Sequence, residues 1–257
     1  MHYILPVIFM LLSIEVRGQT HWLKLTGGLI INRSEIQFLE ADEGFSQKNY
    51  QIGYKFGLTY DHFFQVQDRN SLGIRTGLQL AKKRYCVQLT TIQSYQEINN
   101  SDAELKVNVG VFPNYLVVEL PIALLYKKSV GGNFNFLSFA AGCSLDWMKG
   151  SLMATNSHLE LFNPQGIPQQ FQIRTTDDFA FDSQLGYSTF LSTSYNFLLT
   201  NRRYGEIGIS YHLSPVKLDA LHITHSINGE IFEAISQPKR LDYLQFFISY
   251  SLSRKKD

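Results

Sequence analysis

His212 and Ser214 lie two residues apart in the segment His212-Leu213-Ser214, and Glu206 comes shortly before them in the chain. In a β-strand this spacing puts the imidazole and the hydroxyl on one face. An imidazole that takes the proton of a serine hydroxyl, and is itself oriented by a carboxylate, can drive ester hydrolysis. These residues are therefore candidates for catalysis, although a histidine and a serine alone are a weak signal without a placed third group.

Six charged side chains alternate with apolar residues in strand-like segments, which predicts that they lie on the face opposite the apolar one. If that face lines a narrow closed barrel, side chains fill the interior, and opposite charges should pair because an unpaired buried charge is very costly. A self-neutralising polar plug is the prediction, with a narrow ion path or a binding cavity as the alternative. The residues are Lys24, Lys55, Arg75, Glu119, Asp146 and Glu206.

Asp42-Glu43 and Asp177-Asp178 are acidic pairs that could hold Ca²⁺ or bridge lipopolysaccharide through divalent ions. They lack the spaced ligands of a calcium loop, so solvated loop charges are the prediction. The chain has no glycine-rich phosphate loop, no zinc-ligand spacing and no basic-aromatic patch. Its net charge of +1, with 18% charged residues, gives no reason to expect a nucleic-acid partner. We therefore expect no metal site and no cofactor.

Cys86 and Cys143 are the two cysteines of the chain. Cys143 shares the parity of apolar neighbours, whereas Cys86 shares that of Arg84 and Gln88. Side chains on opposite faces of a sheet do not meet, and no Cys-x-x-Cys motif is present. Two free, structural thiols are predicted.

The segment 51–61 shows the pattern that organises the chain: five apolar side chains alternate with a polar set that includes Lys55 and Asp61. This is the period of a β-strand with one apolar and one polar face. Pro121 should cause a bulge or a locally unpaired site, because it has no N–H for the ladder. Strands are predicted at 22–32, 51–61, 71–80 (extending through 85–89), 115–126, 134–147, 184–197, 204–213 and 241–252.

The connections between these strands alternate in length. Those after the second, fourth and sixth strands are short, whereas 33–49, 90–111, 148–182 and 214–240 are long and polar. In an up-and-down meander all long loops project from one rim, as in outer-membrane barrels. The fold class predicted is an all-β, eight-stranded antiparallel transmembrane barrel with short periplasmic turns and long extracellular loops. A soluble lipocalin-like barrel, the alternative, needs an apolar lumen and a polar exterior.

Residues 1–18 have the pattern of a signal peptide, with an apolar run at 3–14 and small residues near Gly18. The alternative is a buried strand or helix of the fold, since the segment before the apolar run has no Lys or Arg. Cleavage before Gln19 would leave a barrel domain of 19–257. The remaining chain has no apolar run long enough for a membrane-spanning helix.

The strand 115–126, YLVVELPIALLY, resembles a strand of the PorT-like outer-membrane β-barrel proteins of the Bacteroidota. The glycine-punctuated strands at 53–60 and 73–80, and the closing strand at 243–252, are also similar. The resemblance implies an outer-membrane barrel, and some members belong to the type IX secretion machinery. The step Glu119-Leu120-Pro121 departs from the family by lacking one inserted residue.

The His-x-Ser pair is similar to that of outer-membrane lipid A deacylases, although Pro215 stands where that family has Asn. The function predicted is that of a non-enzymatic outer-membrane barrel, with a structural or interaction role in the envelope. Expected partners are outer-membrane lipid and lipopolysaccharide, and an envelope protein bound through loops 90–111, 148–182 and 214–240. The alternatives are an envelope-lipid hydrolase using His212 and Ser214, and a minor pore or small-ligand binder.

Overall fold

The structure is a computed structural model, and the predicted signal peptide at 1–18 lies outside the part that it describes. The described residues are 21–41, 45–48, 50–66, 70–84, 86–96, 102–111, 114–130, 135–151, 158–162, 168–175, 183–199, 203–215, 221–227 and 230–252.

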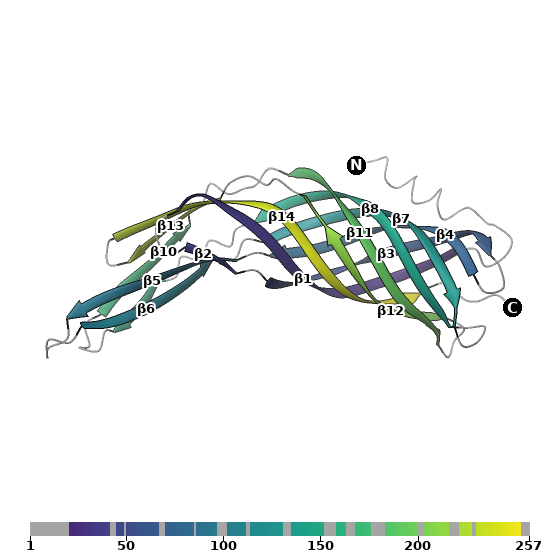
Figure 1. The fold of residues 1–257 in the computed structure, drawn as a ribbon, viewed down its shortest axis with the longest axis horizontal. Helices are drawn as coiled ribbons and strands as arrows, with labels where there is room; N and C mark the ends of the chain where they lie inside the picture. The colour runs from purple at the N-terminus through teal and green to yellow at the C-terminus, as the bar shows by residue number, and fades with distance from the viewer. Residues whose placement is uncertain are drawn as a thin grey trace.

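Eight long strands form a closed antiparallel barrel (Figure 1). Each pairs with the next barrel strand along the chain, and the last, β14, pairs with β1 to close the sheet. The predicted all-β, eight-stranded up-and-down barrel is confirmed. The strands are β1 (His21–Ala41), β3 (Tyr50–Val66), β4 (Asn70–Arg84), β7 (Asn114–Ser129), β8 (Phe136–Ser151), β11 (Gln184–Leu198), β12 (Tyr204–Leu213) and β14 (Glu230–Ser251).

The strand register fixes the stagger of the barrel. Following paired residues around the wall from Trp22, through Asp61 and Arg75, leads back to β1 at Asn32, ten residues further on. A stagger of this kind requires strands tilted by about 35–45° to the barrel axis. The interior of an eight-stranded barrel is only wide enough for side chains to fill it.

The short connections all lie at one rim, as predicted. They join β3 to β4, β7 to β8 and β11 to β12. The start of β1 and the end of β14 meet at the same rim, where the N–H of Leu252 donates to the carbonyl of Leu23 at 2.7 Å. The alternation of long and short connections is therefore confirmed.

The long connections contain strands that the sequence analysis did not predict. β1 and β14 continue well past the predicted ends at 32 and 241, still paired with each other, and β14 also pairs with β13. The segment 86–96, predicted in part to prolong β4, instead pairs with β2 and β6 in a separate sheet (Figure 1). These additional strands are β2 (Phe45–Lys48), β5 (Cys86–Gln96), β6 (Asp102–Val111), β9 (His158–Phe162), β10 (Pro168–Thr175) and β13 (Leu221–Ile227).

The outer face of the barrel is apolar and the inner face is polar. Ile52, Ile122, Leu191 and Ile248 are each at least 60% exposed on the outer face of four different strands. Side chains of the opposite parity point inward, and on β3 and β7 they include the buried charges Lys55, Asp61 and Glu119, as the predicted parity required. No helix among the described residues is long and apolar enough to cross a membrane.

Pro121 and Cys143 behave as predicted. The ladder between β4 and β7 is interrupted beside Pro121 without any change of register, so the site is locally unpaired and not bulged. Cys143 is a free thiol exposed on the outer face. The side chain of Cys86 lies outside the described part of the chain.

A cluster of aromatic and apolar side chains fills the barrel at the short-turn rim. Trp22 from β1 stacks on Tyr204 from β12 with ring centroids 4.4 Å apart, and meets Phe63 and Phe136 edge-on. Offset and edge-on contacts are the arrangements that aromatic rings prefer. Trp22, Phe63, Leu125 and Tyr204 are buried, so this cluster closes the interior at that end.

We predict that Gly142→Val destabilises the barrel whereas Gly27→Val does not. A Cβ on Gly142 would meet the carbonyl oxygen of Ile122 at 2.2 Å and the Cα of Ala123 at 2.6 Å, while one on Gly27 meets nothing within 4 Å. Overpacking of this kind should cost about 1–3 kcal/mol. The difference is measured by thermal unfolding, with the faster gel mobility of the folded, unboiled barrel as the readout. Equal stabilities of the two variants would contradict the close approach of β7 and β8.

Candidate functional site: the charged interior of the barrel

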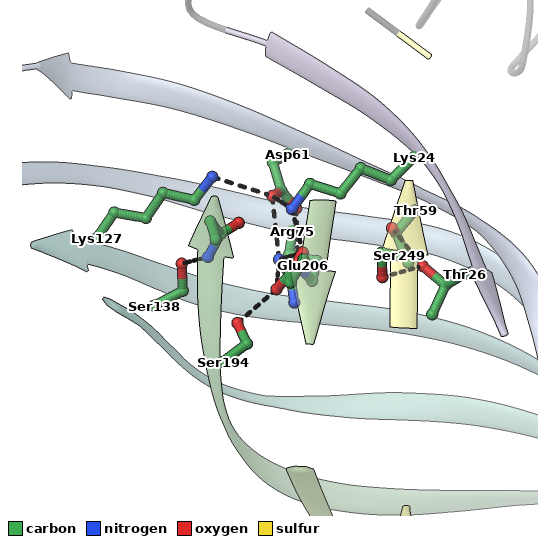
Figure 2. Close-up of polar contacts among 11 residues, drawn as sticks. Lys24, Thr26, Thr59, Asp61, Arg75, Lys127, Ser138, Ser194, Glu206 and Ser249 are labelled. Carbon is green, nitrogen blue, oxygen red and sulfur yellow. Dashed lines mark hydrogen bonds and ion pairs between the residues drawn. The ribbon is translucent and has the colours of Figure 1, made fainter. Parts of the chain in front are cut away.

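An inner layer of charges lies inside the barrel (Figure 2), and its Lys127 contacts the aromatic cluster. We use "inner layer" for Lys24, Asp61, Arg75, Lys127 and Glu206, which come from β1, β3, β4, β7 and β12. The guanidinium of Arg75 donates through Nε to Asp61 at 2.7 Å and through Nη2 to Glu206 at 3.0 Å. Lys24 forms ion pairs with both carboxylates, at 2.7 Å to Asp61. The layer therefore ties four strands together across the lumen.

Ser194 and Lys127 complete this layer. The Ser194 hydroxyl donates to Glu206 at 2.5 Å. The Lys127 ammonium lies 3.7 Å from the Asp61 carboxylate and 3.2 Å from the centroid of the Trp22 ring. A cation over the face of a tryptophan is attracted by the ring quadrupole, so Lys127 joins the inner layer to the aromatic cluster below it.

An outer layer of charges lies further along the barrel. We use "outer layer" for Lys55, Lys83, Glu119, Asp146 and the His212–Tyr243 pair. Glu119 forms ion pairs with the ammonium groups of Lys55, at 2.5 Å, and Lys83, at 3.2 Å. It also accepts a hydrogen bond from the Tyr243 hydroxyl at 3.0 Å. Asp146, opposite Glu119 in the β7–β8 register, has no hydrogen-bond partner on either oxygen.

His212 belongs to this outer layer and not to a catalytic triad. Its Nδ1 lies 2.8 Å from the Tyr243 hydroxyl and its Nε2 lies 3.0 Å from the Ser210 hydroxyl. Ser214 uses its backbone N–H to bond Asp242, and its hydroxyl has no hydrogen-bond partner. Because Glu206 is committed to the inner layer, the structure does not bring together the three residues on which the hydrolase alternative rests.

The charged side chains of the interior neutralise one another in ion pairs. The predicted pairing of Lys24, Lys55 and Arg75 with Glu119 and Glu206 is confirmed, although Asp146 lacks a hydrogen-bond partner. Within the described residues no group of three His, Cys, Asp or Glu side chains could hold a metal ion. The acidic pairs at 42–43 and 177–178 lie outside those residues.

Two interior cations escaped the sequence analysis. Lys127 was placed in a turn, but β7 continues to Ser129 and carries the Lys127 side chain inward, where it is buried. Lys83 lies in the predicted extension of its strand past residue 80, where no inward charge was assigned, and it is fully buried. The available signal was parity, because Lys83 continues the inward series of Arg75 and Gln79, and Lys127 that of Glu119.

We predict that Glu206→Gln destabilises the barrel far more than Asp146→Asn. Glu206 pairs with two buried cations, and breaking a buried pair by removing one partner costs about 3–5 kcal/mol. Asp146 makes no hydrogen bond that an amide would lose. Thermal unfolding of both variants beside the parent protein checks this, and a larger loss for Asp146→Asn would refute the assignment of Glu206 as the main partner of Lys24 and Arg75.

No protein-family model matches the chain, and no curated protein matches it. Solved structures with a similar fold include the outer membrane protein OprG from Pseudomonas aeruginosa, at 11% identity and a TM-score of 0.40, covering 92% of this chain and 99% of that one. The outer membrane protease OmpT from Escherichia coli is similar at 9% identity and a TM-score of 0.38, covering 93% and 99%. The attachment invasion locus protein Ail of Yersinia pestis is similar at 10% identity and a TM-score of 0.30, covering 89% and 99%. The architecture of this chain is established by its own strand order and register, to which these distant likenesses add nothing.

Proposed function

We propose that this protein is an outer-membrane β-barrel that crosses the bilayer with its eight barrel strands. The main support is the distribution of side chains over the barrel wall. Large apolar side chains are exposed on the outer face of every barrel strand, while charged side chains are buried inside. Monomeric soluble proteins rarely expose a contiguous apolar area of this kind, whereas a lipid-facing barrel requires one. A closed barrel also leaves no unpaired strand edge in the bilayer, where each unsatisfied backbone group is costly.

The protein acts without catalysis in this proposal. Both ring nitrogens of His212 are engaged by neighbours other than Ser214, which favours a structural role for the histidine. The pore alternative has less support, because the aromatic cluster around Trp22 and two layers of paired charges fill the lumen. Transport by this barrel is therefore not part of the proposal.

Contacts with partners are assigned to the strands beyond the membrane. β5, β6, β10 and β13 lie together beyond one end of the barrel (Figure 1), and apart from the first residues of β5 they fall in the segments 90–111, 148–182 and 214–240 expected to meet an envelope protein. Outer-membrane lipid and lipopolysaccharide would surround the wall. Export through a signal peptide at 1–18, and the PorT-like, secretion-associated role implied by strand 115–126, are parts of the same proposal.

We predict that Ile122→Arg strongly destabilises the protein in a bilayer, whereas Leu252→Arg has a small effect. Ile122 is 60% exposed in the central part of β7, and Leu252 is 42% exposed at the short-turn rim. Arginine on the lipid face costs about 2–4 kcal/mol at the bilayer midplane and about 0–1 kcal/mol near the interface. Unfolding from lipid vesicles measures both. A protein that fractionates with soluble proteins and tolerates Ile122→Arg would refute the membrane assignment.

We predict that production of the protein leaves the acylation of lipid A unchanged. Mass spectrometry of lipid A should give the same spectrum for cells carrying the parent protein, the His212→Ala variant, the Ser214→Ala variant and an empty vector. The enzyme alternative would gain support from an acyl chain lost only with the parent protein and restored by either substitution.

A further inference from the structure

A small cavity lies in the middle of the barrel, between the inner and outer charged layers. Its volume is about 40 Å³. A single buried water needs about 10–15 Å³ by the same measure, so the cavity holds one to three particles of that size. It is lined by residues from both layers, including Lys55, Arg75 and His212, and by hydroxyl and amide side chains.

The charged groups at this cavity are basic. None of its lining residues, all of which the structure describes, carries a carboxylate. Arg75 uses Nε and Nη2 on Asp61 and Glu206, so the two N–H groups of Nη1 remain as donors. The Lys55 ammonium has three N–H groups and contacts two partners, Glu119 and Tyr243, which leaves one.

The neutral lining groups add further donors. Thr26 bonds Thr59 at 3.2 Å and Ser249 at 2.8 Å, so three hydroxyl hydrogens serve two mutual hydrogen bonds and at least one hydrogen is left over. Gln245 also lines the cavity, and its Oε1 atom accepts a hydrogen bond from the Ser210 hydroxyl at 3.1 Å.

The buried charges of the two layers do not balance. Five basic side chains, Lys24, Lys55, Arg75, Lys83 and Lys127, face four carboxylates, those of Asp61, Glu119, Asp146 and Glu206. Asp242 is also buried, but it pairs with Arg240 and lies on the face of β14 opposite Tyr243. With every side chain counted in its ordinary charged form, the inner layer holds three cations and two carboxylates, and its Arg75 lines the cavity. Uncompensated buried charge is costly, so a bound anion would relieve it.

We propose that this central cavity is a binding site for a single halide-sized anion, held by Lys55, Arg75 and the surrounding hydroxyl and amide donors. The anion neutralises the interior and links the two charged layers. A volume of about 40 Å³ suits one small anion. The site is independent of whether the barrel wall faces lipid, since it depends only on the interior.

The test is a titration of the folded full-length chain with sodium bromide, replacing sodium gluconate at constant total salt. Bromide should raise the melting temperature saturably, by about 3–6 °C at ten times its dissociation constant, because it binds only the folded state. Crystals grown in bromide should show an anomalous scattering peak between Lys55 and Arg75. A bromide titration with no shift, or a cavity that contains water alone, would overturn the site.

Gln245→Glu is the decisive variant, and Gln245→Met is its control. The glutamate retains the acceptor used by Ser210 and places a negative charge in the cavity, so we expect it to abolish the bromide response and to be more stable than the parent protein in gluconate. Methionine is neutral and of similar size, and Lys55 and Arg75 remain, so a bromide response should persist. An undiminished response in Gln245→Glu would also overturn the proposal.

Discussion

Five basic side chains must share the interior of a narrow closed sheet with four carboxylates, and the rest of the structure depends on how they do so. Charges this deeply buried are tolerated only when they are paired. Glu206 and Glu119 each meet two cations contributed by different strands, so the wall is braced across the lumen at two levels. The inner level cannot form until the barrel closes, because Glu206 on β12 meets Lys24 on β1 and Arg75 on β4.

Closure sets a second constraint, on size. Gly142 lies where a side chain would collide with the backbone of β7, and the stagger of ten residues fixes how far the strands tilt. The same narrowness lets Trp22, Phe63 and Tyr204 seal one end with their rings. Lys127 sits between that seal and the inner layer, so aromatic packing and charge pairing support each other.

Much of the barrel follows from the sequence, because period-two alternation marks a wall with one apolar and one charged face. The eight strands, the direction of Lys24, Arg75 and Glu119, and the short-turn rim were predictable on that ground. The strands outside the barrel were not, since segments such as 86–96 lack regular alternation of apolar side chains. Strand ends were also uncertain, which hid the cations Lys83 and Lys127. The hydrogen-bond partners of His212 could not be predicted from the sequence. Parity puts both Ser210 and Ser214 on its face, and the structure shows that Ser210 is the partner. Tyr243 comes from β14, which only the folded barrel brings next to His212.

The most direct test of the inverted wall uses the two tryptophans of the chain. Trp22 is buried in the lumen with 9% of its surface exposed, and Trp147 is 41% exposed on the outer face of β8. Each would be replaced by phenylalanine in turn, and the remaining tryptophan fluorescence measured in vesicles whose acyl chains carry bromine, a contact quencher. The account predicts strong quenching of Trp147 and little quenching of Trp22. Strong quenching of Trp22 with Trp147 unaffected, or no quenching of either, would contradict it.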